Sequence, residues 1–368
     1  MNDNLYTHLE INIPNLKHNL CYFRSLLKKE TKLLILVKAN GYGHGLGEFS
    51  RILEENGVDY LAVAFPNEGV AIRQAGVKLP IIILSAGMEH YPLLIKHRLE
   101  PSLPCTEAFE RFTKEAEALG EAGYPVHIKL DTGMHRLGFE KQELENLITK
   151  LPKANSVKIA SVFSHFAASP ETTFDNFSKL QIARFEELSS YLFDHLDYKP
   201  IRHLLNSSGI ERFAKEAQYD MARLGIGLYG VSGIDNKLLK PTAYLRAPVL
   251  QVKTILPGET VGYSRAGVVK DSPVRIATVA IGYADGVDRH LSRGKGYFSV
   301  NGHKAPIFGN VCMDMCMIDV TDIHVQPGDM VTVFGDSPTI SELAEILGTI
   351  SHEILTSVAH RVPRIYKD

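Results

Sequence analysis

The residue of this sequence with the clearest chemical potential is Lys38, which separates a buried strand from a glycine-rich loop. Five large apolar residues, Leu33–Val37, precede it without a polar break, as is typical of a strand buried on both faces of a parallel sheet. Glycine then recurs at alternate positions, from Gly41 to Gly47. A lysine that is partly removed from water at a strand's carboxyl end can act as a nucleophile, a Schiff-base former or a general base. The alternative interpretation is an ordinary solvated lysine.

Further polar side chains follow other predicted strands at the same end. They include Asp131–Arg136, Ser164–His165, His203, Asn206–Gly209 and Arg223 with Gly225 and Ile226. In a barrel these strand ends converge on one pocket, although each residue taken alone is equally consistent with a structural role. Together with Lys38 they outline a site for a phosphorylated cofactor, because small residues with free N–H groups at Ser207 and at Gly225-Ile226 suit a phosphate near a helix N-terminus.

The elements that must position these residues alternate between strands and helices from Pro14 to Gly230. The predicted strands are Leu33–Val37, Asp59–Ala64, Ile81–Leu84, Glu100–Leu103, Val126–Leu130, Val157–Phe163, His203–Leu205 and Met221–Leu224. The predicted helices are Pro14–Leu27, Gly47–Glu55, Glu68–Ala75, His90–His97, Thr106–Leu119, Lys141–Leu151, Thr173–Phe193 and Gly209–Lys215. About eight such units predict an α/β fold with an N-terminal TIM (β/α)8 barrel. No G-x-G-x-x-G follows the first strand, which argues against a dinucleotide fold.

Helical periodicity mostly ends near Val231–Ala247. Beyond it the predicted strands are Val249–Ile255, Arg275–Ile281, Tyr297–Val300, Met315–Val320 and Met330–Phe334, with one helix at Thr339–Gly348. Pro-Gly and Asn-Gly turn signals separate them. We therefore expect a barrel over residues 1–235 and a mainly β C-terminal domain over residues 236–368. The first strand, about residues 6–12, could pair with the C-terminal domain.

The bulk composition excludes several classes of function. The chain has 368 residues and a net charge of −2, so no basic field indicates a nucleic-acid partner or a membrane surface. Its first residues carry neither a basic nor an apolar segment, which argues against a signal peptide and favours a cytoplasmic location. Four cysteines are too few for a disulfide scaffold. Cys312 and Cys316 lie in an apolar run, which favours buried thiols over a metal site.

Several motifs, taken in order, resemble the alanine racemases nearly end to end. They are VKANGYGHG, KLDTGMHRLGF, SHFA, NSSG, MARLGIGLYG, VGYSRAG, IGYADGV, KAPIFGNVCMDM and RVPR. The N-terminal motifs alone would also fit other barrel enzymes that use pyridoxal 5'-phosphate (PLP). The C-terminal motifs point to the racemase branch, whose members interconvert L- and D-alanine and supply D-alanine for peptidoglycan.

The resemblance implies a role for each matched residue. Lys38 would hold PLP covalently, and it and Tyr263 would be the two catalytic bases, with Tyr263 supplied by the partner subunit of a head-to-tail homodimer. The implied cofactor contacts are Tyr42, His165, His203, Asn206, Ser207, Arg223, Gly225, Ile226 and His360. The implied substrate contacts are Arg136, the Met313 backbone, Tyr283, Asp314 and Lys129, which some members carry as a carbamate. No metal is implied.

Two bases make chemical sense, because racemisation removes a proton from one face of Cα and returns one to the other. An arginine at the pyridine nitrogen keeps its proton, so the ring nitrogen stays largely unprotonated and PLP is a weaker electron sink. That suits racemisation over transamination.

Four positions depart from the family pattern: Gly41, His135, Ser264 and His360. A histidine at 135 could narrow the substrate pocket, and His360 stands where the family often has a tyrosine that reaches the cofactor phosphate. A broader-specificity amino-acid racemase of the same fold, an amino-acid decarboxylase and a PLP-binding protein without turnover are the alternatives. Tyr263 and the second domain argue against the last.

Overall fold

Eight parallel strands form the N-terminal lobe, as predicted. The computed structural model describes residues 6–368, and its barrel strands are neighbours in the order β8-β7-β6-β5-β4-β3-β2-β9. They are β2 (Lys32–Leu36), β3 (Tyr60–Val63), β4 (Ile81–Ile83), β5 (Glu100–Leu103), β6 (Tyr124–Lys129), β7 (Val157–Phe163), β8 (Ile201–His203) and β9 (Met221–Leu224). Backbone hydrogen bonds from Asp220 to Arg202 (3.2 Å) and from Arg223 to Leu205 (3.0 Å) join the two end strands and close the barrel.

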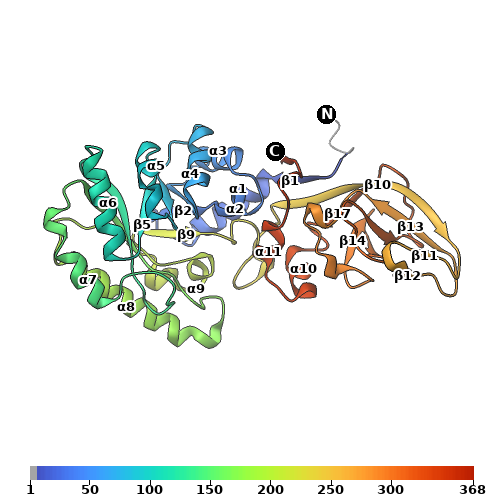
Figure 1. Cartoon of the computed structure of the whole chain (residues 1–368). Coiled ribbons are helices and arrows are strands. Elements are labelled where there is room, and N and C mark those ends of the chain that lie inside the picture. The colour runs from blue at the N-terminus through green and yellow to red at the C-terminus, as the bar shows by residue number, and fades with distance from the viewer. Residues whose placement is uncertain (1–5) are drawn as a thin grey trace.

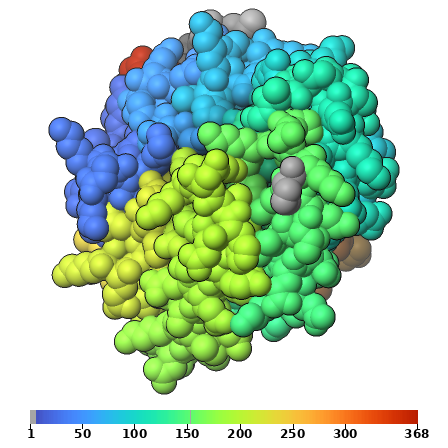
Figure 2. Space-filling view, turned by 90° about the vertical axis from the view of Figure 1, so that its left-hand side faces the viewer, coloured from blue at the N-terminus to red at the C-terminus, as the bar shows by residue number. Residues whose placement is uncertain are grey.

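Helices surround the barrel because each presents an apolar stripe to the strands. They are α3 (Gly47–Glu55), α4 (Pro66–Gln74), α5 (Tyr91–Lys96), α6 (Thr106–Ala118), α7 (Lys141–Ile148), α8 (Asp175–Phe193) and α9 (Ser207–Ala217). In α6, for example, Ala108, Phe109, Phe112 and Ala116 are buried at helical spacing. The space-filling view from the barrel end shows that this lobe covers nearly all of that face (Figure 2). Residues 1–5 of the expected barrel segment lie outside the described residues.

The first strand joins the C-terminal lobe and not the barrel. Strand β1 (His8–Asn12) pairs antiparallel with β10 (Ala243–Ile255) and parallel with β18 (Arg364–Lys367). The chain then enters α1 (Ile13–Ser25), where the Asn12 side chain caps the helix by accepting a hydrogen bond from the Asn15 N–H at 2.8 Å. The first and last strands of the described chain therefore lie side by side near the junction between the lobes (Figure 1).

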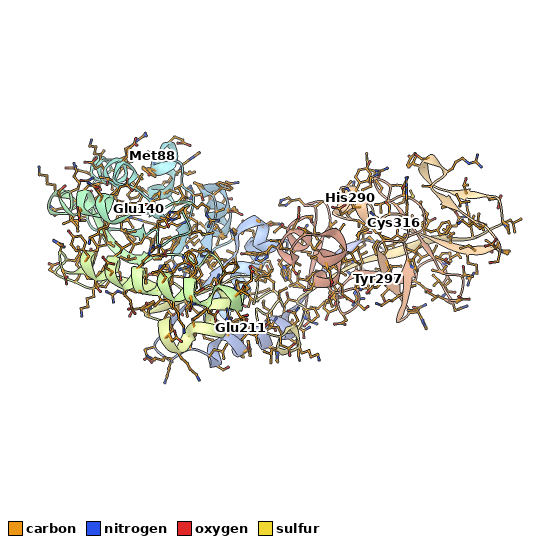
Figure 3. All side chains as sticks on the ribbon, turned by 90° about the horizontal axis from the view of Figure 1, so that it is seen from below. Met88, Glu140, Glu211, His290, Tyr297 and Cys316 are labelled. Carbon is orange, nitrogen blue, oxygen red and sulfur yellow. The ribbon has the colours of Figure 1, made fainter. Side chains whose placement is uncertain are left out.

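The C-terminal lobe is mainly β, as predicted, and lies beside the barrel in Figures 1 and 3. Its other strands are β11 (Thr260–Val261), β12 (Gly267–Val268), β13 (Val274–Val279), β14 (Tyr297–Val300), β15 (His303–Pro306), β16 (Cys316–Asp319) and β17 (Met330–Phe334). Two helices, α10 (Ile340–Leu347) and α11 (Ser351–Thr356), face the barrel. Thr339 and Glu342 form a capping box at the start of α10.

No helix among residues 6–368 is long and apolar enough to cross a membrane.

Candidate active site

Lys38 lies at the carboxyl end of β2, on the wall of a cavity of about 770 Å³. It begins a short helical turn, α2 (Lys38–Tyr42), in which residues 39–41 have left-handed backbone angles. The turn ends at Gly43, with φ +85°, where an added Cβ would lie 2.2 Å from the Leu355 carbonyl oxygen, so only glycine fits. Burial, and then the nearby Arg136 charge, lower the pKa of Lys38. This lysine is therefore more readily deprotonated than a solvated one.

The N-terminus of α9 forms a cradle for an anion in the same cavity. The Asn206 side chain caps the helix by accepting from the Gly209 N–H at 2.8 Å. The Ser207 hydroxyl oxygen accepts from the N–H groups of Gly225 (3.0 Å) and Gly227 (3.1 Å). Within the described part of the chain the Ile226 N–H makes no hydrogen bond, and Ile226 lines the cavity. A free N–H donor beside a helix N-terminus suits a phosphate group.

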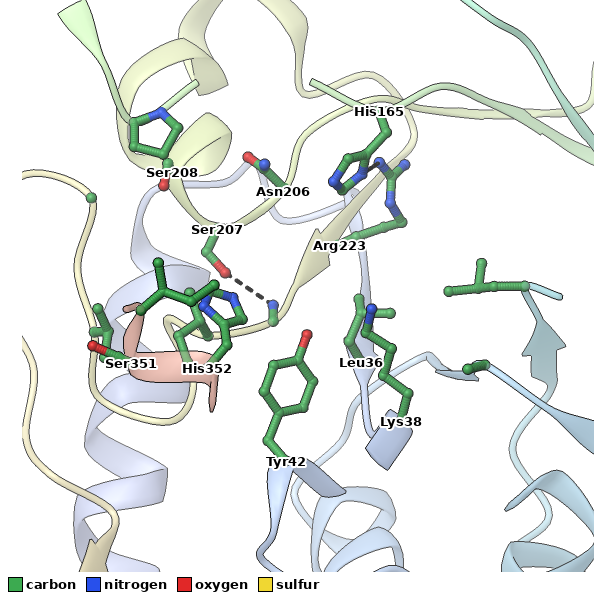
Figure 4. A pocket seen from close by; sticks show the side chains of 18 of the residues that line it. Leu36, Lys38, Tyr42, His165, Asn206, Ser207, Ser208, Arg223, Ser351 and His352 are labelled. Atoms are coloured by element: carbon green, nitrogen blue, oxygen red, sulfur yellow. Dashed lines mark hydrogen bonds between the residues drawn. The ribbon is translucent and has the colours of Figure 1, made fainter. Parts of the chain in front are cut away.

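Tyr42 closes the cradle from the other side. Its ring stacks on Tyr229, with centroids 4.5 Å apart and planes at 20°, and its hydroxyl points toward Ser207 (Figure 4). A Cβ at Gly225 would lie 3.2 Å from that hydroxyl, so a glycine at this position leaves space for the Tyr42 hydroxyl. Burial raises the pKa of Tyr42 well above its ordinary value. The phenol therefore stays protonated and can donate a hydrogen bond to an anion.

Arg223, on β9, is held by protein acceptors on both terminal nitrogens. Nη1 donates to Nδ1 and to the carbonyl oxygen of His203, both at 3.0 Å. Nη2 donates to the carbonyl oxygens of Ser164 (2.6 Å) and Leu204 (2.9 Å) and to His165 Nδ1 (3.1 Å). Burial lowers the pKa of Arg223 to about 9, which still leaves it charged at neutral pH. Within the described residues Nε makes no hydrogen bond, so it is the donor left for a ligand.

The two histidines beside Arg223 occupy different places. His165 lines the cavity, whereas His203 lies behind Arg223 with its ring stacked on Phe163, at a centroid distance of 4.9 Å. Burial and the Arg223 charge lower the pKa of both histidines well below the ordinary value. Both rings are therefore neutral at physiological pH and can accept from the guanidinium.

Two further cations line the cavity. Lys129 ends β6, and burial together with Arg136 and Arg223 lowers its pKa to about 8. Arg136 lies in the loop that follows β6, with its neighbour His135 pointing to solvent. His135, whose side chain is 71% exposed, does not line the cavity, so the expectation that it narrows the pocket is wrong. Its φ of +51° explains why glycine suits this position.

The histidine that faces the cradle is His352 and not His360. His352 lies in the first turn of α11, lines the cavity, and has its ring 5.9 Å from that of Tyr42. Burial lowers its pKa. His360, by contrast, is exposed just beyond α11 and does not line the cavity. The sequence offered no signal for His352, because an isolated histidine in a predicted loop has no distinguishing neighbours.

The remaining predicted site residues form a second cluster on the C-terminal lobe. Tyr263, Tyr283 and Met313 are 72%, 44% and 53% exposed. Hydrogen bonds hold their turns together. The backbone N–H groups of Tyr283 and Ala284 donate to the carbonyl oxygens of Cys312 (2.9 Å) and Met313 (3.0 Å). The Asn310 side-chain amide donates to the Tyr263 carbonyl oxygen (3.1 Å). None of them lines the cavity at Lys38.

Asp314 belongs to the same cluster. It pairs with Arg361 at 2.6 Å, and Arg361 also bonds to Asp285 at 2.8 Å. One chain thus carries two separate groups of predicted site residues, one around Lys38 and one around Tyr263.

A barrel with a partly buried lysine beside an anion cradle, followed by a β domain, is an arrangement suited to an enzyme that binds a phosphorylated ligand. Comparison with known proteins specifies the class. The model of the alanine racemase N-terminal domain matches residues 11–233, and that of the C-terminal domain matches residues 242–366. The chain is 37% identical to alanine racemase 1 of Clostridium acetobutylicum, over 97% of this chain and 94% of the relative.

Solved structures agree. An alanine racemase from Clostridium difficile 630 superposes with a TM-score of 0.92 at 32% identity, covering 99% of this chain and 96% of that one. Another, from Bartonella henselae with covalently bound pyridoxal phosphate, gives 0.88 at 30% identity over 98% and 99% of the two chains. The chain belongs to the alanine racemase family, and its activity is the isomerisation of alanine between its L and D forms.

Proposed function

We propose that this chain racemises alanine with PLP bound at Lys38, and that Lys38 and the partner subunit's Tyr263 are the two bases. The observation that carries this proposal is that Lys38 and the cradle formed by Ser207, Gly225 and Ile226 line a single cavity. A relative of the same fold binds pyridoxal phosphate covalently. We further propose a homodimer, a cytoplasmic location, and a role in supplying D-alanine for peptidoglycan.

The residues present fit PLP. The Ser207 hydroxyl, the free Ile226 N–H and the protonated Tyr42 phenol would hold the phosphate, while Arg223 Nε–H would donate to the pyridine nitrogen. When bound, PLP withdraws electrons from the substrate and so acidifies its Cα–H. Because Arg223 remains protonated, the ring nitrogen would not take a proton from it. Arg136 would hold the substrate carboxylate by charge-assisted hydrogen bonds.

Proton transfer would then use two residues on opposite faces of the substrate. Lys38 Nζ, whose pKa is lowered by burial, would remove or return the proton on one face. The phenol oxygen of Tyr263 would do so on the other face. Within one chain Tyr263 is exposed and does not line the Lys38 cavity, which supports its delivery by a second subunit.

Mixing two inactive variants tests this shared site. Lys38→Ala removes one base and Tyr263→Phe removes the other, so each homodimer should be inactive. In a two-fold dimer the mixed species regains one intact site. Half of randomly mixed dimers are mixed, and each has one of two sites intact, so we expect roughly a quarter of wild-type activity. Recovery of no activity from two folded, exchanging variants would refute the shared site.

Covalent attachment is tested separately. Borohydride reduction of the purified protein with PLP should fix the pyridoxyl group on the Lys38 peptide, and Lys38→Ala should carry none. Deuterium incorporation at Cα of L-alanine in D₂O, with formation of D-alanine, measures the reaction itself. A broader substrate range is the second candidate, and racemisation of L-serine at a rate comparable to that of L-alanine would favour it.

A further inference from the structure

A line of hydrogen-bonded side chains runs behind the site, across five adjacent barrel strands. Arg223 Nη1 lies 3.0 Å from His203 Nδ1, and His203 Nε2 lies 2.9 Å from the Ser161 hydroxyl oxygen. That oxygen lies 2.6 Å from His127 Nδ1, and His127 Nε2 lies 2.8 Å from a carboxylate oxygen of Glu100. His203, Ser161 and His127 are almost wholly buried. This row of hydrogen bonds, called the relay below, thus links Arg223 on β9 to Glu100 on β5.

Both ends of this relay impose the same hydrogen-bond direction. A guanidinium can only donate, so His203 Nδ1 must accept and His203 carries its proton on Nε2. At the other end an ionised carboxylate can only accept, so His127 donates from Nε2. Within the described residues the Ser161 hydroxyl has no other partner. With a neutral His127 ring, Ser161 therefore accepts from His203 and donates to His127, so that every hydrogen bond of the relay has the same direction.

The direction of these hydrogen bonds matters because the other His203 tautomer would disrupt the contact with Arg223. If His203 carried its proton on Nδ1, an N–H group would face the Arg223 Nη1–H at 3.0 Å, and the contact would become repulsive. Burial and the Arg223 charge lower the pKa of His203 well below its ordinary value, so the ring stays neutral and its tautomer is the variable. Arg223 is almost wholly buried and makes no direct contact with a carboxylate among the described residues.

We propose that Glu100, His127 and Ser161 are positioning residues for the racemase reaction, which fix the His203 tautomer and thereby aim Arg223 at the cofactor ring. None of the three lines the cavity, so they act through Arg223 and not on the substrate. This inference rests on the proposed role of Arg223 toward PLP. The fixed tautomer itself is a property of the protein alone, so it can be tested with or without that role.

Ser161→Ala interrupts the relay with the smallest change of volume. Ser102→Ala is the matched control, because Ser102 is also a buried serine in the barrel, on β5, in register with His127, and its hydroxyl has no hydrogen-bond partner. Glu100→Gln is the second variant. It preserves the shape of the side chain but adds an amide N–H that can turn toward His127, so the direction of the hydrogen bonds is no longer fixed at this end. Ring ¹⁵N shifts of labelled protein, assigned by loss of signal in His203→Asn, report the tautomer.

The wild-type protein should show His203 protonated on Nε2. In Ser161→Ala that signal should move toward a mixture of tautomers, and the dissociation constant for PLP should rise roughly tenfold, the change expected for one lost buried hydrogen bond. In Ser161→Ala the kcat should fall by a larger factor than KM changes. The kcat and PLP affinity of Glu100→Gln should lie between those of wild type and Ser161→Ala. Ser102→Ala should match wild type in both.

Three results would overturn the proposal: a wild-type His203 protonated on Nδ1, an unchanged His203 signal in Ser161→Ala with unchanged PLP affinity, or an equal loss in Ser102→Ala. If PLP never attaches to Lys38 while the ¹⁵N shifts behave as expected, the proposed function fails and the relay remains.

Discussion

Ser207→Ala should be costly even though the side chain is small, because one oxygen serves two buried donors. The Ser207 hydroxyl accepts from the N–H groups of Gly225 and Gly227 at 3.0 and 3.1 Å, and all three residues are buried. Each buried donor left unpaired costs about 1–3 kcal/mol. Partial access of water to Gly225 through the cavity reduces the sum, so we expect the free energy of unfolding to fall by about 2–4 kcal/mol.

The same substitution should weaken PLP binding. A hydroxyl that accepts two hydrogen bonds has its own proton free to donate, and no acceptor for it is found among the described residues. Loss of this donor to the phosphate should raise the dissociation constant roughly tenfold.

The assays are urea unfolding of the PLP-free protein and equilibrium dialysis with PLP. Ser178→Ala is the control, because Ser178 is buried in α8 and its hydroxyl has no partner. The reasoning is refuted if Ser178→Ala loses as much stability as Ser207→Ala, or if Ser207→Ala loses almost none.

Two further predictions follow from the strained loop and from the buried lysine. His135→Gly should raise the free energy of unfolding by about 0.5–1 kcal/mol, because φ is +51° there and relief of the left-handed strain exceeds the entropy cost of glycine. His135→Ala should not raise it, and equal urea midpoints for the two variants would contradict the argument. Since the pKa of Lys129 is lowered to about 8, the neutral amine that reacts with CO₂ is well populated at pH 8 and scarce at pH 6. We therefore expect a ¹³C carbamate signal with labelled bicarbonate at pH 8 that is lost at pH 6 and in Lys129→Met; a signal that persists in Lys129→Met would assign it elsewhere.

The barrel could be predicted from the sequence because each unit carries a local pattern. Glu100–Leu103, Val157–Phe163 and Met221–Leu224 were predicted with the bounds observed. Strand β8 is wrong by two residues, since His203–Leu205 is predicted and Ile201–His203 is observed, and α11 is missed. The larger errors concern pairings between distant segments. Strand β18 lies in a polar C-terminal segment, and its pairing with β1 depends on bringing the two chain ends together, which no local pattern records. The strand β10 extends back to Ala243, into a stretch whose mixed composition indicated only a boundary.

The candidate site was predictable to the extent that its residues follow strands. Lys38, Arg223 and Ser207 lie at strand or helix ends, and the barrel brings them together. His127 and Ser161 were not predicted, because a single polar residue inside a strand is usually structural and their partnership arises from the register between β6 and β7. Those pairings become visible only when the strands are side by side.

The charges that line the cavity favour anionic ligands. Lys38, Lys129, Arg136 and Arg223 all line it, and Glu345 is the one carboxylate among the described residues that do. The cations lower one another's proton affinity, since the Arg136 charge contributes to the lowered pKa of both Lys38 and Lys129. A phosphate in the cradle and a carboxylate at Arg136 would relieve that repulsion. The same crowding that favours these two ligands also lowers the pKa of Lys38, which makes the deprotonated form that a base requires more accessible.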